Sequence, residues 1–251
     1  MNTFLWAMLP YACVTLLIGG TIYRYRYDQF GWTTRSSQLY ESTLLKIGSP
    51  LFHFGILLVI VGHFMGLVIP KRWTDAVGLS QEAYHVIAYG GGLVAGAATV
   101  IGLVMLIYRR RTNARVFDAT TVNDKVMYVF VAAAILLGTL CTLFGTHGVS
   151  GAEHNYRETV SPWFRSLFVF RPDVEAMTQA PLVFHLHVLV ALLLFAIWPF
   201  TRLVHAFTAP LHYLFRPYVV YRSRSGAPTP VSTGSTRGWS PIGTTDRKFH
   251  R

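Results

Sequence analysis

The sequence has few of the residues on which most soluble enzymes depend. Only two of its 251 residues are cysteines, Cys13 and Cys141, and both lie in apolar stretches. They are too few and too far apart for an iron–sulfur cluster, a zinc site or a disulfide framework, so we expect them to be packing residues. Charged residues make up only 13% of the chain, whereas 52% of the residues are hydrophobic. This composition excludes an ordinary soluble domain.

A phosphate-binding glycine loop is also missing. Gly90, Gly91, Gly92 and Gly96 are close together, but no strand precedes them and their spacing does not match a nucleotide-binding fingerprint. Small residues in an apolar helix let neighbouring helices approach closely in lipid. We therefore expect these glycines to serve helix packing.

The apolar residues are gathered in five blocks, each long enough for a helix to cross about 30 Å of hydrocarbon. They cover residues 4–23, 51–69, 84–108, 126–144 and 181–200. The first block lacks the basic start and the small-residue cleavage pattern of a signal peptide, so it is interpreted as a span. The sequence predicts an all-α integral membrane protein with five transmembrane helices in residues 1–221. The basic tail, residues 222–251, is rich in Ser, Thr, Gly and Pro, and is either disordered or docked on a partner.

The net charge of +11 would suggest nucleic-acid binding in a soluble chain, but here the basic residues mark topology. Most of them lie after the first span, after the third span and after the fifth span, including Arg24, Arg26, Arg109, Arg110, Arg111, Arg222 and Arg224. Cytoplasmic loops of membrane proteins carry the excess of Lys and Arg. The N-terminus is therefore expected outside and the C-terminus in the cytoplasm, and no nucleic-acid partner is expected.

Four histidines belong to two of the predicted spans. His53 and His63 lie on the second, His187 lies on the fifth, and His205 lies just past the end of the fifth. Ionisable residues within a membrane are rare and usually functional. Because the two spans run in opposite directions, His63 and His187 fall at the same depth, about 9 Å below the outer boundary, and His53 and His205 fall near the inner one. Two opposed imidazole pairs are typical of two b-type haems.

The separations along the two spans do not match. His53 and His63 are about 15 Å apart along a helix, whereas His187 and His205 would be about 27 Å apart. We expect a tilt of the helices or haems to absorb the difference, helped by a kink at Pro199. On a continuous helix His187 shares a face with His205, which favours it over His185 as a ligand. His185 is then expected to hydrogen-bond within the bundle or to face the outer interface, with a direct role at the outer haem as the alternative.

Several other side chains receive specific expectations. Arg202 is expected to pair with a propionate of the inner haem or to anchor the chain at the membrane surface. The second ring nitrogen of each ligating imidazole should donate to a carbonyl or carboxylate. The outer loop, residues 146–180, is expected to form a short interfacial helix around Trp163 and Phe164. The remaining histidines are expected in solvated loops or the tail: His147, His154, His212 and His250.

Four stretches of sequence carry a family resemblance. They read RYDQFGWTTRSSQ after the first span, LFHFGILLVIVGHFMGLVIP in the second, ARVFDATTVND before the fourth and HLHVLVALLLFAIWPFTRLVHAF in the fifth. Together they resemble the gamma subunit, the cytochrome b subunit, of membrane-bound respiratory nitrate reductase, over roughly residues 5 to 220.

The resemblance implies a di-haem subunit of the bacterial cell membrane that oxidises a quinol, ubiquinol or menaquinol, near the outer haem. His63 and His187 match the ligands of the outer haem, and His53 and His205 those of the inner one. Gly62 and His63 match positions in contact with the quinol. Some family members have a lysine near the start of the third span; this chain has QEAYH there, which makes His85 a candidate quinol contact.

The resemblance also implies that electrons pass inward to cytoplasmic iron–sulfur and molybdenum subunits, which reduce nitrate to nitrite. No nitrate-reducing site is expected on this chain. One alternative is the di-haem anchor of another quinone-linked enzyme, such as a hydrogenase, formate dehydrogenase or fumarate reductase, although the loop motifs argue against it. A second alternative is a proton-coupled transporter with a histidine relay, which would be colourless.

Overall fold

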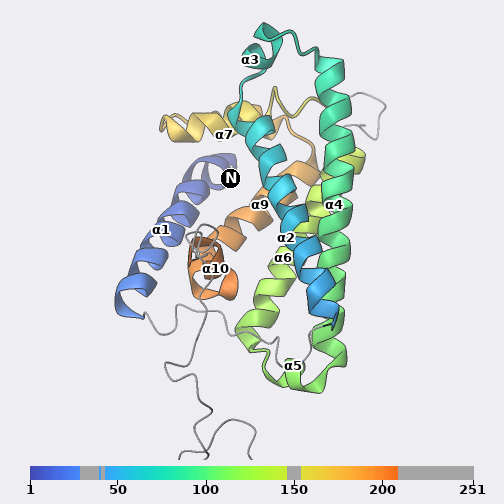
Figure 1. Cartoon of the computed structure of the whole chain (residues 1–251). Helices are drawn as coiled ribbons and strands as arrows, with labels where there is room; N and C mark the ends of the chain where they lie inside the picture. Colours follow the sequence, from blue (N-terminus) through green and yellow to red (C-terminus); the bar gives the residue numbers. More distant parts are fainter. Residues whose placement is uncertain (29–39, 41–42, 146–153, 209–251) are drawn as a thin grey trace, which may run out of the picture. The chain divides into compact units, whose positions relative to one another are not determined.

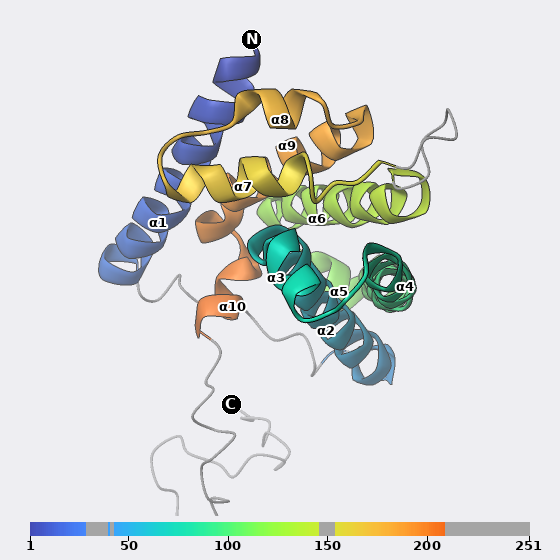
Figure 2. The same cartoon turned by 90° about the horizontal axis from the view of Figure 1, so that it is seen from above.

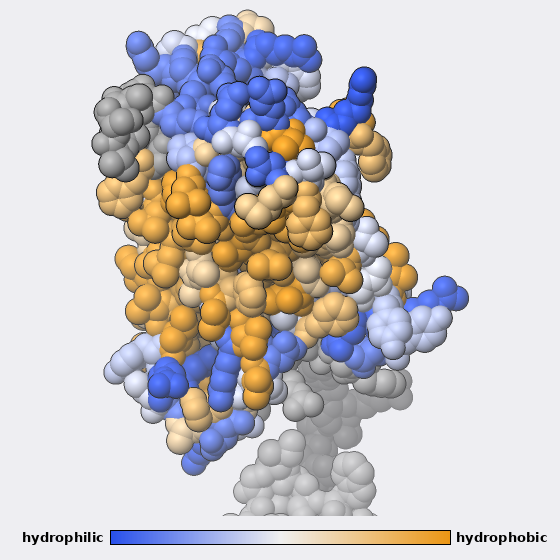
Figure 3. All heavy atoms as spheres, turned by 180° about the vertical axis from the view of Figure 1, so that it is seen from behind, coloured by the Kyte–Doolittle hydropathy of each residue, from blue (hydrophilic) through white to orange (hydrophobic). Residues whose placement is uncertain are grey.

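The computed structural model describes residues 1–28, 40, 43–145 and 154–208, and every regular element in these residues is a helix. Some predictions lie outside the described residues. They concern residues 209–251, including the tail, His212 and His250, and also His147. Five helices are long and apolar enough to cross a membrane: Phe4–Tyr27, Thr43–Val68, Gln81–Thr112, Val122–Phe144 and Leu182–Phe200. These agree with the five predicted spans. The space-filling view of one face shows apolar side chains gathered in a central zone, with polar ones toward both ends (Figure 3).

The first span combines η1 (Phe4–Met8) with α1 (Leu9–Tyr27), and the second combines α2 (Thr43–His63) with η2 (Phe64–Val68). The short helix α3 (Lys71–Ala76) follows the second span. The third span is α4 (Gln81–Thr112), and α5 (Ala114–Asp118) follows it. Figure 1 shows α3 and α5 at opposite ends of α4.

The fourth span begins at α6 (Val122–Leu140) and continues as η3 (Cys141–Gly145). Two short helices, α7 (Val160–Phe168) and α8 (Val174–Thr178), precede α9 (Leu182–Ile197). The chain then forms the 3-10 turns η4 (Trp198–Phe200) and η5 (Arg202–Val204) before α10 (His205–Thr208). A short helix with Trp163 and Phe164 is therefore present as α7, and its position at a membrane interface stays a prediction.

Local sequence explains where the long helices begin. Ser80 accepts a hydrogen bond from Ala83 N at the start of α4, and three arginines lie in its last turn, where positive charge favours the helix dipole. At the start of α6, Thr121 and Asp124 form a capping box in which each side chain accepts from the other residue's backbone N–H.

The helices α2 and α4 lie side by side (Figures 1 and 2) and their backbones meet at two glycines. A Cβ on Gly102 would lie 2.5 Å from the backbone nitrogen of Phe52, and one on Gly55 would lie 2.7 Å from that of Thr99. No larger residue fits at either position without moving a backbone. The two glycines therefore set the spacing of this helix pair.

The predicted packing role of the other glycines is confirmed for only half of them. Gly92 and Gly96 face Thr142 and Thr139, with contacts of 3.3 and 3.8 Å from a built Cβ. For Gly90 and Gly91 it stays a prediction, since no neighbouring atom of the described chain lies within 4 Å of a Cβ built there. Clustering of glycines in sequence did not identify the closest helix contact, because that contact depends on which face meets α2.

One apolar cluster joins α7, α8 and α9 to the first span. Its buried members are Trp6, Cys141, Val160, Trp163, Met177, Ala180 and Phe184. The Trp163 indole donates a hydrogen bond to the backbone oxygen of Trp6 at 2.7 Å, so the buried N–H of Trp163 is satisfied. Cys13 and Cys141 are buried free cysteines, as the sequence predicted.

Candidate functional site

The first predicted histidine pair is present at one level of the bundle. His63 ends α2 and His187 lies on α9, and their ring centres are 6.0 Å apart with planes inclined by 41°. The contact on α6 is close as well: a Cβ on Gly138 would lie 3.0 Å from Cε1 of His187. The absence of a side chain at Gly138 therefore gives the His187 ring its place.

The second predicted pair joins His53, on α2, with His205, the first residue of α10. Their ring centres are 5.9 Å apart and their planes are inclined by 67°. Ten residues of continuous helix separate His53 from His63, which corresponds to about 15 Å. The structure thus brings together the two pairs that the sequence predicted, at two levels along α2.

Hydrogen bonds fix the tautomer of three of these rings. Nδ1 lies 2.7 Å from Ser49 O in His53, 2.8 Å from Val59 O in His63 and 2.6 Å from Arg202 O in His205. A carbonyl oxygen only accepts, so each Nδ1 carries the proton and each Nε2 keeps its lone pair. This is the arrangement in which a neutral imidazole binds a metal.

The distance within each pair suits one metal ion between two rings. Imidazole nitrogen binds Zn²⁺ at about 2.0–2.1 Å, and a similar bond to iron on each side would put the ring centres roughly 6 Å apart. Each pair supplies two ligands, and among the described residues no group of three or more His, Cys, Asp or Glu could hold an ion. A porphyrin would supply four further nitrogens, so the paired histidines fit a bis-histidine haem.

The route of the chain to His205 corrects an expectation. Placing His187 and His205 on one helical face requires a continuous helix between them, but α9 ends at Ile197 and Thr201 is extended, with φ −115° and ψ 175°. Pro199 lies within this break, where a proline interrupts the helical hydrogen bonding. The helix is therefore interrupted rather than kinked, which resolves the mismatch of 15 and 27 Å. His187 is paired as expected, although the helical-phase argument for it was wrong.

Arg202 has a protein partner that was not predicted, and the two roles expected for it stay predictions. Its Nε donates to Asp124 Oδ1 at 2.7 Å and its Nη2 to Asp124 Oδ2 at 2.8 Å. This two-pronged contact with a carboxylate on α6 is the strong geometry of an arginine ion pair. Asp124 was not predicted as the partner of Arg202, because 78 residues separate the two.

His185 forms the hydrogen bond within the bundle that was one of the roles expected for it. Its Nε2 lies 2.7 Å from the backbone oxygen of Met177, and its ring centre is 4.9 Å from that of Trp6. It therefore hydrogen-bonds within the bundle. His154 was expected to be solvated, and this was wrong: it is partly buried, bonded to Thr159 Oγ1 at 3.0 Å, and burial lowers the pKa of its imidazole.

A polar network next to His63 and His187 was also missed from sequence. Tyr156 reaches Gly66, one turn beyond His63, and its ring stacks on Phe184, one turn before His187. Its hydroxyl lies 3.1 Å from that of Tyr84. Burial raises the pKa of the Tyr156 phenol, so this hydroxyl stays protonated.

Arg157 covers the Tyr84 side of this network. Its guanidinium lies 3.9 Å from the centre of the Tyr84 ring and donates to Thr74 Oγ1 at 2.9 Å. The side chain is almost fully buried, with 3% of its surface exposed. An arginine in a loop gives no periodic signal in the sequence that could mark it as buried.

The two remaining quinol candidates, Gly62 and His85, have different surroundings. Gly62 precedes His63 on α2, and no neighbouring atom of the described chain lies within 4 Å of a Cβ built there. His85 lies in the first turns of α4 and stacks on Tyr89 with ring centres 6.1 Å apart. Gly62 thus presents an open surface beside the pair, whereas His85 packs within its own helix.

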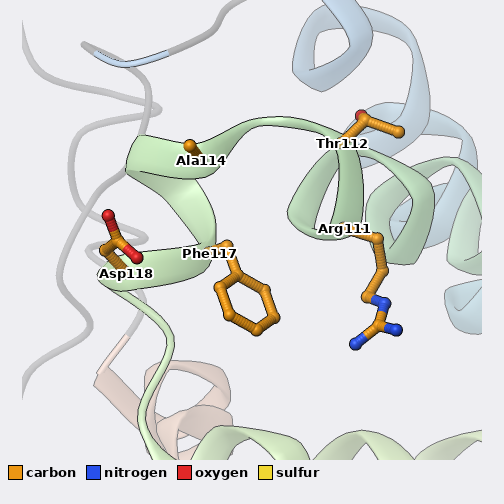
Figure 4. A pocket seen from close by; sticks show the side chains of 5 residues that line it. All are labelled: Arg111, Thr112, Ala114, Phe117 and Asp118. Atoms are coloured by element: carbon orange, nitrogen blue, oxygen red, sulfur yellow. The ribbon is translucent and has the colours of Figure 1, made fainter.

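A separate cavity lies at the junction of α4 and α5. Arg111, Thr112, Ala114, Phe117 and Asp118 line it (Figure 4). The Arg111 guanidinium lies 5.8 Å from the centre of the Phe117 ring. None of the paired histidines lines this cavity, so it is not the predicted cofactor site.

Residues 2–224 match the family model described as nitrate reductase gamma subunit. The chain belongs to this family. It is 45% identical to the nitrate reductase gamma chain of Bacillus subtilis over 221 residues, which cover 88% of this chain and 98% of that protein. It is 34% identical to the respiratory nitrate reductase 2 gamma chain of Escherichia coli over 225 residues, covering 89% and 98%.

A third relative is longer. The chain is 58% identical over 239 residues to the nitrate reductase-like protein NarX of Mycobacterium tuberculosis, a match that covers 95% of this chain and 36% of that protein. The chain therefore spans about a third of the length of NarX. Its family and its five helices that are long and apolar enough to cross a membrane indicate a multi-pass membrane protein.

Proposed function

We propose that this chain is the di-haem cytochrome b subunit of a quinol-dependent nitrate reductase. His63 and His187 would hold the outer haem, and His53 and His205 the inner one. The observation that carries the proposal is the pair of 6 Å separations between opposed imidazole rings, at two levels of a bundle from the gamma family. The N-terminus is proposed to lie outside and the C-terminus in the cytoplasm of a bacterial cell.

Three of the four paired histidines share one hydrogen-bonding arrangement. The Nδ1–H bonds of His53, His63 and His205 to backbone carbonyls orient each ring and leave Nε2 free to bind. A bound haem supplies one-electron redox chemistry between ferric and ferrous iron.

Quinol is proposed to bind beside the outer pair, next to Gly62 and His63, with His85 as a further contact. Its oxidation to quinone releases two electrons and two protons. The electrons would pass inward to the level of His53 and His205, and the protons would leave on the outer side. Charge would therefore separate across the membrane. The electrons would then reach cytoplasmic iron–sulfur and molybdenum subunits that reduce nitrate to nitrite.

A redox-titrated absorption spectrum of the purified membrane complex tests this function. We expect a b-type spectrum with about two haems per chain. His63→Ala should remove one haem together with quinol oxidation, and His53→Ala should remove the other haem. The matched control is His185→Ala, because that imidazole lies on the same helix as His187 but bonds to a carbonyl. A colourless complex, or loss of both haems from either variant, would contradict the assignment.

A further inference from the structure

The inner histidine pair poses a positional problem that the outer pair does not. His63 and His187 belong to long helices, whereas His205 follows the end of α9, two 3-10 turns and the extended residue Thr201. The helix that carries His187 therefore cannot fix the position of His205. Some other contact must set it.

The first turn of α6 supplies that contact. The Asp124 carboxylate, with 6% of the residue exposed, receives both prongs of the Arg202 guanidinium at 2.7 and 2.8 Å. The side-chain amide of Asn123 donates to the backbone oxygen of Phe200. The segment between the helix break and His205 is thus tied to α6 at two consecutive residues of that helix.

The same contacts extend from Asp124 through Arg202 to the imidazole of His205. Arg202 uses its side chain to bind Asp124 and its backbone oxygen to accept from Nδ1 of His205 at 2.6 Å. A carbonyl at Nδ1 fixes both the tautomer and the rotation of a ligating imidazole. The carboxylate of Asp124 is therefore connected to the ring of His205 through one residue.

We propose that Asp124 is a positioning residue for the inner haem, acting through Arg202 on the ligand His205. The inference rests on the proposed di-haem function. It also differs from a direct arginine–propionate contact, because both prongs of the guanidinium are directed at the protein's own carboxylate. A bidentate pair of this kind specifies geometry as well as charge.

The test is Asp124→Asn in the assembled membrane complex. Asparagine keeps an oxygen that can accept from Thr121 N, so the capping box survives while the charge that holds Arg202 is lost. We expect roughly a 10–100-fold loss of inner-haem affinity, the usual cost of removing a residue that orients a metal ligand. The low-spin electron paramagnetic resonance signal and midpoint potential of the remaining inner haem should shift, and those of the outer haem should not.

Two controls separate positioning from helix stability and from general charge loss. Thr121→Ala removes the side chain that caps α6 and leaves the carboxylate–guanidinium pair in place, so it should leave the inner haem signal unchanged. Asp75→Asn breaks an exposed ion pair with Lys71 at 3.0 Å and should change neither haem. An equal loss of the inner haem in Thr121→Ala and Asp124→Asn would overturn the proposal.

Arg202→Lys provides a second, milder variant in case Asp124→Asn does not assemble. Lysine keeps the positive charge but lacks the two-pronged geometry, so the inner haem signal should shift by less than in Asp124→Asn. An unchanged inner haem in Arg202→Lys and Asp124→Asn, or loss of both haems together, contradicts the positioning role. A wild-type complex without b-type haem would instead remove the proposed function, so the two failures are distinguishable.

Discussion

The outer and inner histidine pairs have nearly the same ring separation, 6.0 and 5.9 Å, but the chain reaches them differently. At the proposed outer level both proposed ligands belong to long helices, and the lack of a side chain at Gly138 makes room for the ring of His187. At the inner level one ligand follows a helix break, and a charged contact between Asp124 and Arg202 locates it. Steric fit at Gly138 determines the position of the His187 ring, whereas an ion pair determines the position of the segment that leads to His205.

The largest expected effect is a loss of stability from a substitution that should affect both histidine pairs equally. Gly102→Ala adds a Cβ 2.5 Å from the backbone nitrogen of Phe52, at the crossing of α2 and α4. Overpacking of this kind costs about 1–3 kcal/mol of stability, and occasionally more. Because α2 carries one ligand of each pair, both haems should be lost in parallel on heating, measured by absorption at increasing temperature.

The control for this crossing is Gly91→Ala on the same helix, where no neighbouring atom of the described chain lies within 4 Å. That substitution should leave the thermal transition unchanged or raise it slightly, since alanine favours a helix over glycine. Selective loss of one haem in Gly102→Ala would show that α2 does not act on both pairs together.

A smaller and selective effect is expected at Gly138. Gly138→Ala places a methyl group 3.0 Å from Cε1 of His187, so the ring must shift by a few tenths of an ångström. We expect a change in the midpoint potential of the outer haem and no change in that of the inner one, in a redox titration. Gly96→Ala is the matched control, because its nearest neighbour, Thr139 Oγ1, lies 3.8 Å away. Equal shifts of both potentials would remove the distinction between the two levels.

The smallest effect on the haems is expected at Gly62. Gly62→Ala meets no neighbouring atom of the described chain within 4 Å, so both haems and the fold should be retained. If quinol binds there, the added methyl group should raise the KM for quinol roughly 10-fold, the factor that corresponds to about 1.4 kcal/mol. The measurement is steady-state quinol oxidation, with Gly90→Ala as the control. Unaltered kinetics would exclude Gly62 from the quinol site.

Sequence patterns predicted the outer level better than the inner one. The spans follow from hydropathy, and the pairing of His63 with His187 follows from their depths. Hydropathy and depth can each be read from one helix at a time. Pro199 signalled an irregularity, but proline does not specify how far the following chain turns away, so the break between Ile197 and His205 was not foreseen. Asp124 was missed for a similar reason: its partner lies 78 residues away and no local spacing connects them.

The helix α2 runs without interruption from His53 to His63, and this continuity has a consequence for transfer rates. Tunnelling slows exponentially as the gap between donor and acceptor widens, so a spacing that fluctuated would make the inward step erratic. With one proposed ligand at each level, α2 separates His53 from His63 by about 15 Å along its axis and would help to keep the distance between the two proposed haems constant. Movements of the chain beyond Pro199 would then change the midpoint potential of the proposed inner haem and leave the electron-transfer distance unchanged.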